Sequence, residues 1–107
     1  MKKYKNYEFK NLNGDIYGKK PLYDVRYVTT IRDMLDSSCS LFADNIAIMY
    51  KKSHSSPYTE VKYRTLKKDV YALGTALINL GLKGKKIGII GPTCYEWAVS
   101  YLATVCG

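Results

Sequence analysis

The stretch "YRTLKKDVYALGTALINLGLKGKKIGIIGPTCYEWAVSYLATVCG", residues 63–107, decides the predicted fold. Thr65 is a residue type that commonly caps a helix N-terminus, because its hydroxyl can accept from a free backbone amide. Apolar residues follow it at a spacing of three and four, which predicts an amphipathic helix over residues 65–80. The expected buried stripe of this helix consists of Leu66, Val70, Leu73, Leu77 and Leu80.

Glycines and isoleucines predict the end of this helix and the segment after it. Gly81 can adopt the left-handed conformation that ends a helix, which would place Leu82 against Leu77 as in a Schellman motif. Residues 86–91, "KIGIIG", lack the alternation of a strand with one wet face. We therefore expect a short strand that is covered on both faces, as in a parallel sheet, and that Pro92 prevents from extending.

A second helix is predicted over residues 94–106. Thr93 and Glu96 form a Thr-x-x-Glu capping pattern ahead of an apolar run. A strand that passes directly into a helix is the half-unit of an open α/β sheet, and such a helix normally leads to another parallel strand, for which no residues remain after Gly107. The expected inward stripe is Cys94, Trp97, Ala98, Tyr101, Leu102 and Val105.

The middle of the chain predicts a helix followed by a hairpin. Thr30 and Asp33 give a capping pattern for an amphipathic helix over residues 31–42. Residues 46–51 and 58–63 are predicted strands, joined by the polar loop "KSHSSP". The second strand, the helix 65–80 and the strand 86–91 would form a right-handed crossover.

The fold class is therefore α/β, with a β-hairpin and a β-α-β-α unit of a mainly parallel sheet. Two parts are expected along the chain: an arm over residues 1–28, rich in tyrosine and lysine, and an incomplete domain over residues 29–107. The arm shows no sustained period, so we expect it to lie extended on another surface. Its tyrosines would cover the rest of a larger protein or another subunit.

Length and charge limit the classes of protein that fit. The 107 residues allow one domain at most, and the net charge of +8 is spread over residues 1–32 and 51–86 without a long run of lysines.

Three cysteines without close spacing favour reduced thiols and a cytoplasmic chain. Cys94 at a helix start could be acidified by the helix amides, but packing is the preferred interpretation. No segment has the ~20 apolar residues that a membrane span requires.

Catalytic motifs are absent from the sequence. The run "GIIGPT" at residues 88–93 has two glycines and a threonine, but neither a dinucleotide-binding nor a Walker pattern. His54 is the sole histidine and lies in a polar loop, so we expect it to be solvated. The serines at 37–40 and 53–56 lack an activating partner. We assign no catalytic, cofactor-binding or metal-binding residue.

The order of these elements resembles the N-terminal part of the AMP-forming acyl-CoA synthetases, in the adenylate-forming superfamily. Within it, residues 20–107 are most similar to bacterial long-chain fatty-acid CoA ligases. The words that carry the resemblance are Tyr63-Arg64-Thr65-Leu66, Gly81 to Lys86 with Ile87-Gly88-Ile89-Ile90, Tyr95-Glu96-Trp97-Ala98, and Tyr101-Leu102-Ala103.

The resemblance implies a ligase that uses ATP and Mg²⁺ to convert a long-chain fatty acid to an acyl-adenylate, and coenzyme A to convert that to acyl-CoA. The family's phosphate loop, adenine-binding segments and C-terminal lysine lie beyond residues 1–107. These residues would then be scaffold, inactive alone and without tight binding of ATP, coenzyme A or Mg²⁺. No catalytic residue of the family transfers onto this chain.

Other interpretations stay open at this level. The charge and the eleven tyrosines also fit a small basic module that binds RNA or an anionic membrane surface. Nucleic acid is not expected, because no ribonucleoprotein motif is present. The arm over residues 1–28 could instead mediate a homodimer, as N-terminal segments do in some similar synthetases, and the ligase hypothesis allows peripheral membrane association.

Overall fold

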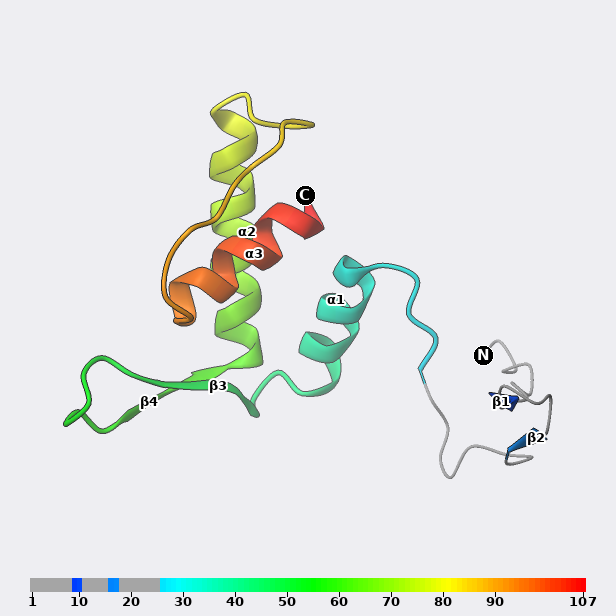
Figure 1. Cartoon of the computed structure of the whole chain (residues 1–107), viewed down its shortest axis with the longest axis horizontal. Helices are drawn as coiled ribbons and strands as arrows, with labels where there is room; N and C mark the ends of the chain where they lie inside the picture. The colour runs from blue at the N-terminus through cyan, green and yellow to red at the C-terminus, as the bar shows by residue number, and fades with distance from the viewer. Residues whose placement is uncertain (1–8, 11–15, 18–25) are drawn as a thin grey trace.

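The computed structural model describes residues 9–10, 16–17 and 26–107 of the chain, and Figure 1 shows how its elements are arranged. Two antiparallel strand pairs are present in these residues, β1 with β2 and β3 with β4. In chain order, the elements are β1 (Phe9–Lys10), β2 (Ile16–Tyr17), α1 (Ile31–Leu41), β3 (Ile46–Lys51), β4 (Tyr58–Lys62), α2 (Tyr63–Asn79) and α3 (Tyr95–Cys106).

Helix α1 begins where the sequence predicts. The Thr30 hydroxyl accepts a hydrogen bond of 3.0 Å from the Asp33 amide, and the Asp33 carboxylate accepts one of 3.1 Å from the Thr29 amide. Side chain and backbone therefore satisfy each other's free groups, as in a capping box. The predicted capping by Thr30 is confirmed.

Strands β3 and β4 form the predicted hairpin. Ile48 lies opposite Val61 and Lys51 opposite Tyr58, with an irregularity in the register between Ile46 and Ile48. In Figure 1 the hairpin extends away from the base of α2, and its polar loop lies at the far tip. Val61 is buried, so one face of the hairpin packs against the helices.

Helix α2 begins directly after β4, two residues earlier than predicted, with Lys62 at the N-cap. The amide of Tyr63 donates a hydrogen bond of 3.1 Å to the carbonyl of Asn45. The amide of Arg64 donates a second one, also of 3.1 Å, to the carbonyl of Ala43. Backbone carbonyls from the turn after α1 thus satisfy the first free amides of the helix. The prediction that Thr65 caps this helix is wrong.

The end of α2 is the predicted Schellman motif. Gly81 has a φ of +77°, the Leu82 amide donates 3.1 Å to the Leu77 carbonyl, and the Gly81 amide donates 2.9 Å to the Ile78 carbonyl. A second turn follows at once, because Gly84 has a φ of +73°. The chain then runs back along α2 toward the start of α3 (Figure 1).

The predicted strand over residues 86–91 does not form. Among the residues that the structure describes, none pairs with this segment as a neighbouring strand. A strand is defined by hydrogen bonds to a second strand. Ile87 and Ile89 are half-buried, whereas Gly88 and Ile90 are exposed. The prediction of a strand that is covered on both faces is therefore wrong for the described residues, and Ile90 is fully exposed.

Helix α3 crosses α2 in Figure 1 and packs with a different face from the predicted one. Its buried residues are Val99, Ala103 and Cys106, whereas Tyr101 and Val105 of the predicted stripe are exposed. A Cβ added at Gly74 of α2 would lie 3.9 Å from the carbonyl oxygen of Ala103, so small residues let the helices approach closely.

The predicted capping box of α3 is also wrong. Cys94 occupies the N-cap and no side chain caps the helix. Its carbonyl accepts from the Ala98 amide at 3.2 Å, so the helix starts one residue after the position that a Thr93 cap requires.

The core lies where α1, α2, α3 and the hairpin meet. Val70 of α2 is its most buried residue, with 2% of its surface exposed. Only the N-terminal half of the predicted α2 stripe is buried, and Leu80 at the other end is 73% exposed. The buried members are Leu35, Cys39, Val61, Leu66, Val70, Val99, Ala103 and Cys106.

The predicted α/β class holds as a mixture of helices and strands. The predicted mainly parallel sheet and its right-handed crossover are absent from the part of the chain that the structure describes, where both strand pairs are antiparallel. Most of the predicted arm over residues 1–28 lies outside the described residues. Within it, β1 and β2 pair with Phe9 opposite Tyr17.

Candidate functional site

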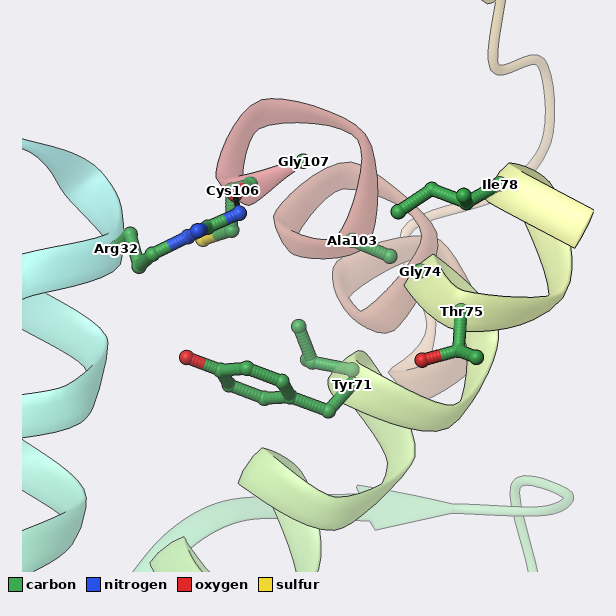
Figure 2. Close-up of a pocket in the computed structure, with 9 residues that line it drawn as sticks. Arg32, Tyr71, Gly74, Thr75, Ile78, Ala103, Cys106 and Gly107 are labelled. Atoms are coloured by element: carbon green, nitrogen blue, oxygen red, sulfur yellow. Dashed lines mark hydrogen bonds between the residues drawn. The ribbon is translucent and has the colours of Figure 1, made fainter. Parts of the chain in front are cut away.

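A small hollow lies between α1, α2 and α3, and Figure 2 shows the side chains around it. Its volume is about 190 Å³. Arg32 reaches across from α1 and donates a hydrogen bond to the carbonyl oxygen of Cys106 on the last turn of α3. The lining residues are Arg32, Val70, Tyr71, Gly74, Thr75, Ile78, Ala103, Cys106 and Gly107.

This hollow has the character of a helix junction. The guanidinium of Arg32 complements the C-terminal end of α3, where free carbonyls carry partial negative charge. The other lining groups are mostly apolar or small. The hollow is too small for a drug-sized ligand, whose pockets usually measure about 300–1,000 Å³.

A polar cluster beside the hollow joins α1 to α2. The Lys67 ammonium lies 2.8 Å from Asp36 Oδ1, and the Tyr71 hydroxyl donates 2.8 Å to each oxygen of the same carboxylate. These two donors hold the pKa of the Asp36 carboxyl below its usual value, with the Lys67 hydrogen bond as the larger cause. The carboxylate in turn raises the pKa of Lys67 and of Tyr71.

A second polar contact joins α3 to α2 and the hairpin. The Tyr95 hydroxyl donates 2.7 Å to Asp69 Oδ2, and the Tyr95 ring stacks on Tyr50 with centroids 5.5 Å apart. Burial, and then the hydrogen bond to the Asp69 carboxylate, raise the pKa of Tyr95 far above its usual value. The raised pKa keeps the Tyr95 hydroxyl protonated, so it donates a hydrogen bond to Asp69. This contact therefore positions α3 against α2.

All three cysteines are free thiols. Burial raises the pKa of Cys39 and of Cys106, and the Cys39 thiol donates to the Tyr63 carbonyl at 3.3 Å. Thiolate chemistry requires the opposite shift. Cys94 is half-buried at the N-cap of α3 rather than on the buried face that the sequence predicted.

The structure brings none of the residues examined for chemistry into one site. His54 lies exposed in the loop between β3 and β4. Gly88 and Gly91 are also exposed. No group of three or more potential metal ligands occurs in the described residues. Within the same residues, no helix is long and apolar enough to cross a membrane.

Sequence reasoning missed the contacts that join the helices. Lys67 and Tyr71 are four residues apart on one face of α2, which was a usable signal. Their partner Asp36 lies 31 and 35 positions earlier in the chain, on α1, and only the packing of α1 against α2 brings it into reach. Arg32 of α1 likewise reaches the Cys106 carbonyl on α3 only because the two helices pack together.

Comparison with known proteins gives one informative similarity. The chain is 30% identical over 77 residues to a mitochondrial medium-chain acyl-CoA ligase of Mus musculus, and this alignment covers 71% of the chain. It spans only 12% of the mouse enzyme. No protein-family profile matches the chain, and no solved structure does.

This similarity supports a relationship to the acyl-CoA synthetases at the level of the family. The similarity agrees with the family that the sequence motifs resemble, the acyl-CoA synthetases. It does not bear on a long-chain preference or on a bacterial subgroup.

Proposed function

We propose that residues 29–107 form a scaffold segment of an AMP-forming acyl-CoA synthetase that acts on long-chain fatty acids. The observation that supports the synthetase part of this proposal is the 30% identity over 77 residues to a medium-chain acyl-CoA ligase. The long-chain preference is proposed from the resemblance of the sequence alone. The segment packs three helices around a hairpin through apolar contacts and two polar contacts. Its contribution to such an enzyme is to build part of the domain that holds the reacting groups.

The proposed reaction has two steps. A fatty-acid carboxylate attacks the α-phosphorus of ATP bound with Mg²⁺, which forms an acyl-adenylate and releases pyrophosphate. The thiol of coenzyme A then attacks the acyl carbon and displaces AMP. The first step is needed because a carboxylate oxygen is a poor leaving group and AMP is a better one.

The residues that would bind ATP, coenzyme A and Mg²⁺ lie outside this segment in the proposed enzyme. The described residues contain no group of three or more side chains that could hold a metal ion. Arg32 is engaged by the Cys106 carbonyl and Lys67 by the Asp36 carboxylate. We therefore propose that the 107 residues alone do not form acyl-adenylate. We also propose, from the reduced cysteines that the sequence favours, that the enzyme acts in the cytoplasm.

The test has two arms. The coding sequence is extended past codon 107, and any longer product is assayed for fatty-acid-dependent exchange of pyrophosphate into ATP, with octanoate and palmitate as probes. We expect exchange with the longer product and preference for palmitate. The 107-residue chain is assayed in parallel and should show background exchange only.

Each result decides a separate part of the proposal. Exchange catalysed by the 107-residue chain would refute its role as scaffold. A preference of the longer product for octanoate would refute the long-chain assignment and leave the ligase assignment in place. A longer product without exchange for either acid, or an open frame that stops at codon 107, would refute the synthetase assignment for this protein.

A further inference from the structure

A second hollow lies between α2, α3 and residues 87–90, and its volume is about 290 Å³. Leu73 and Leu77 line it from α2, and Ser100 and Thr104 line it from α3. The Thr104 hydroxyl already donates a hydrogen bond of 2.8 Å to the Ser100 carbonyl. The lining is therefore more apolar than polar, and it offers a ligand few hydrogen-bonding side chains.

A smaller hollow adjoins the larger one near the C-terminal end of α2. Its volume is about 70 Å³, and the two hollows share Leu77, Ile87 and Thr104 in their linings. Lys83 and Lys85, from the turns after α2, line the smaller hollow. The two hollows thus form one groove, here called the amphipathic groove, which is apolar along its length and basic at one end.

The basic end carries an excess of positive charge. Lys83, Lys85 and the adjoining Lys86 are exposed, and within the described residues none of them is in an ion pair. The groove's described lining contains no aspartate or glutamate. The ends of α2 and α3 lie close by and carry about −0.5 of a charge each. Even with the carboxylate of Gly107 added, about two negative charges face three positive ones.

We propose that the amphipathic groove binds the anion of a medium-chain fatty acid, with the alkyl chain in the larger hollow and the carboxylate at Lys83 and Lys85. The larger hollow lies just below the range of about 300–1,000 Å³ that is usual for drug-sized ligands, so it suits one narrow chain. An alkyl chain needs no hydrogen bonds along its length. A peptide would bring a polar amide at every residue, and few side chains of this groove could satisfy these amides.

The carboxylate end of the ligand matches the basic end of the groove. A lysine ammonium offers three donors and a full charge to a carboxylate, and hydrogen bonds between charged groups are the stronger class. Burial of the alkyl chain supplies the remaining affinity. This inference rests on the shape and charge of the groove and not on the synthetase assignment.

The test is isothermal titration calorimetry of the 107-residue chain with three soluble ligands. We expect saturable binding of decanoate, in the range below its micelle concentration. Butyrate should bind at least tenfold more weakly, because it buries fewer methylene groups. Decyltrimethylammonium has the same chain length with a positive head, and it should also bind at least tenfold more weakly than decanoate.

Two double variants of equal net charge test the basic end. Lys83→Gln with Lys85→Gln should raise the dissociation constant of decanoate at least tenfold. Lys52→Gln with Lys68→Gln is the matched control, because both lysines are exposed and lie outside the groove, and it should bind like the wild type. Ile89→Asn places an amide in the larger hollow and should weaken decanoate as well. Far-ultraviolet circular dichroism checks that each variant keeps its fold.

Several results would overturn the proposal. They are a wild type that does not bind decanoate, equal binding of decanoate and decyltrimethylammonium, and equal weakening by the two double variants. If Lys83 and Lys85 only offset the negative ends of the helices, their double variant should lower the Tm and leave decanoate binding unchanged, which would also overturn it. The synthetase assignment is decided separately, by pyrophosphate exchange in the longer product.

Discussion

The Tyr95 hydroxyl lies 2.7 Å from Asp69 Oδ2, and this hydrogen bond ties the first residue of α3 to the second turn of α2. The ring of Tyr95 also stacks on Tyr50 of β3, with an interplanar angle of 7°. One side chain of α3 therefore contacts two other elements, α2 and β3. Because no side chain caps α3, this contact fixes the point at which the helix begins.

Replacing Tyr95 by Phe should lower the free energy of unfolding by about 1–2 kcal/mol. The substitution keeps the ring and its stacking, but it removes a hydrogen bond to a charged group in a partly buried place. Urea denaturation followed by circular dichroism measures the change. Tyr101→Phe is the matched control on the same helix, because Tyr101 is exposed, and it should stay within about 0.5 kcal/mol of the wild type. Equal losses for both variants would contradict the assigned role of the hydroxyl.

The same residue predicts a loss of stability at alkaline pH. The pKa of Tyr95 is raised in the folded chain, so the folded state retains a proton that the unfolded chain releases near pH 10. Its stabilising contribution is therefore complete below about pH 10 and declines as pH rises toward the folded pKa. Urea denaturation between pH 8 and about pH 11 should show a steeper decline for the wild type than for Tyr95→Phe. Parallel curves would contradict this prediction.

The lowered pKa of Asp36 predicts a loss of stability at acid pH. Its folded pKa is lowered by Lys67 and Tyr71, so its contribution is present above the unfolded pKa of about 4 and is lost as pH falls through the folded value. The side chains of Asp36 and Lys67 are more than a third exposed, so solvent screens the pair and we expect less than about 1 kcal/mol. Asp36→Asn should therefore be less stable than the wild type at pH 7 and equal to it near pH 2.

Salt provides the control for this pair. The deficit of Asp36→Asn at pH 7 should shrink in 1 M NaCl, because the Debye length falls to about 3 Å. Asp44→Asn is the matched variant, since Asp44 pairs with Arg64 at a more exposed place, and it should cost less. A deficit for Asp36→Asn that changes with neither pH nor salt concentration would contradict the charge-based role of the carboxylate.

Local rules predicted the parts of the fold that depend on neighbouring residues. The Thr30 cap of α1, the hairpin and the Gly81 ending of α2 each follow from a few adjacent side chains, and all three form. The parts that failed depend on distant partners. In the part of the chain that the structure describes, residues 86–91 have no neighbouring strand. The face that α3 buries is set by its close approach to Gly74 of α2.

The polar contacts of the site illustrate the same limit. Asp36 with Lys67, and Asp69 with Tyr95, join helices that are far apart in sequence. Neither pair has a spacing that a linear pattern could reveal. The assignment of no catalytic residue rested on motif patterns alone and stays a prediction.

Gly81→Ala should lower the free energy of unfolding by about 1 kcal/mol. The φ of +77° brings a Cβ close to the following carbonyl, which costs roughly 1–2 kcal/mol in an L-residue. No atom within 4 Å would contact the added methyl group, so strain in the backbone is the only cost expected. Gly81→Asn should lose less, because asparagine tolerates this conformation better. Gly91→Ala, without a positive φ, should be neutral by the same urea assay.

A pair of threonines distinguishes the cap that forms from the one that sequence alone predicted. Thr30→Ala removes the side chain that accepts from the Asp33 amide, and it should cost about 1 kcal/mol in the free energy of unfolding. Thr65→Ala should cost less than about 0.5 kcal/mol, because Thr65 lies inside α2 and the carbonyls of Asn45 and Ala43 already satisfy the start of that helix. Thermal and urea denaturation of both variants measure the difference. If Thr65→Ala were the more damaging, α2 would have to begin at Leu66, and its hydrogen bonds to the turn after α1 could not exist in solution.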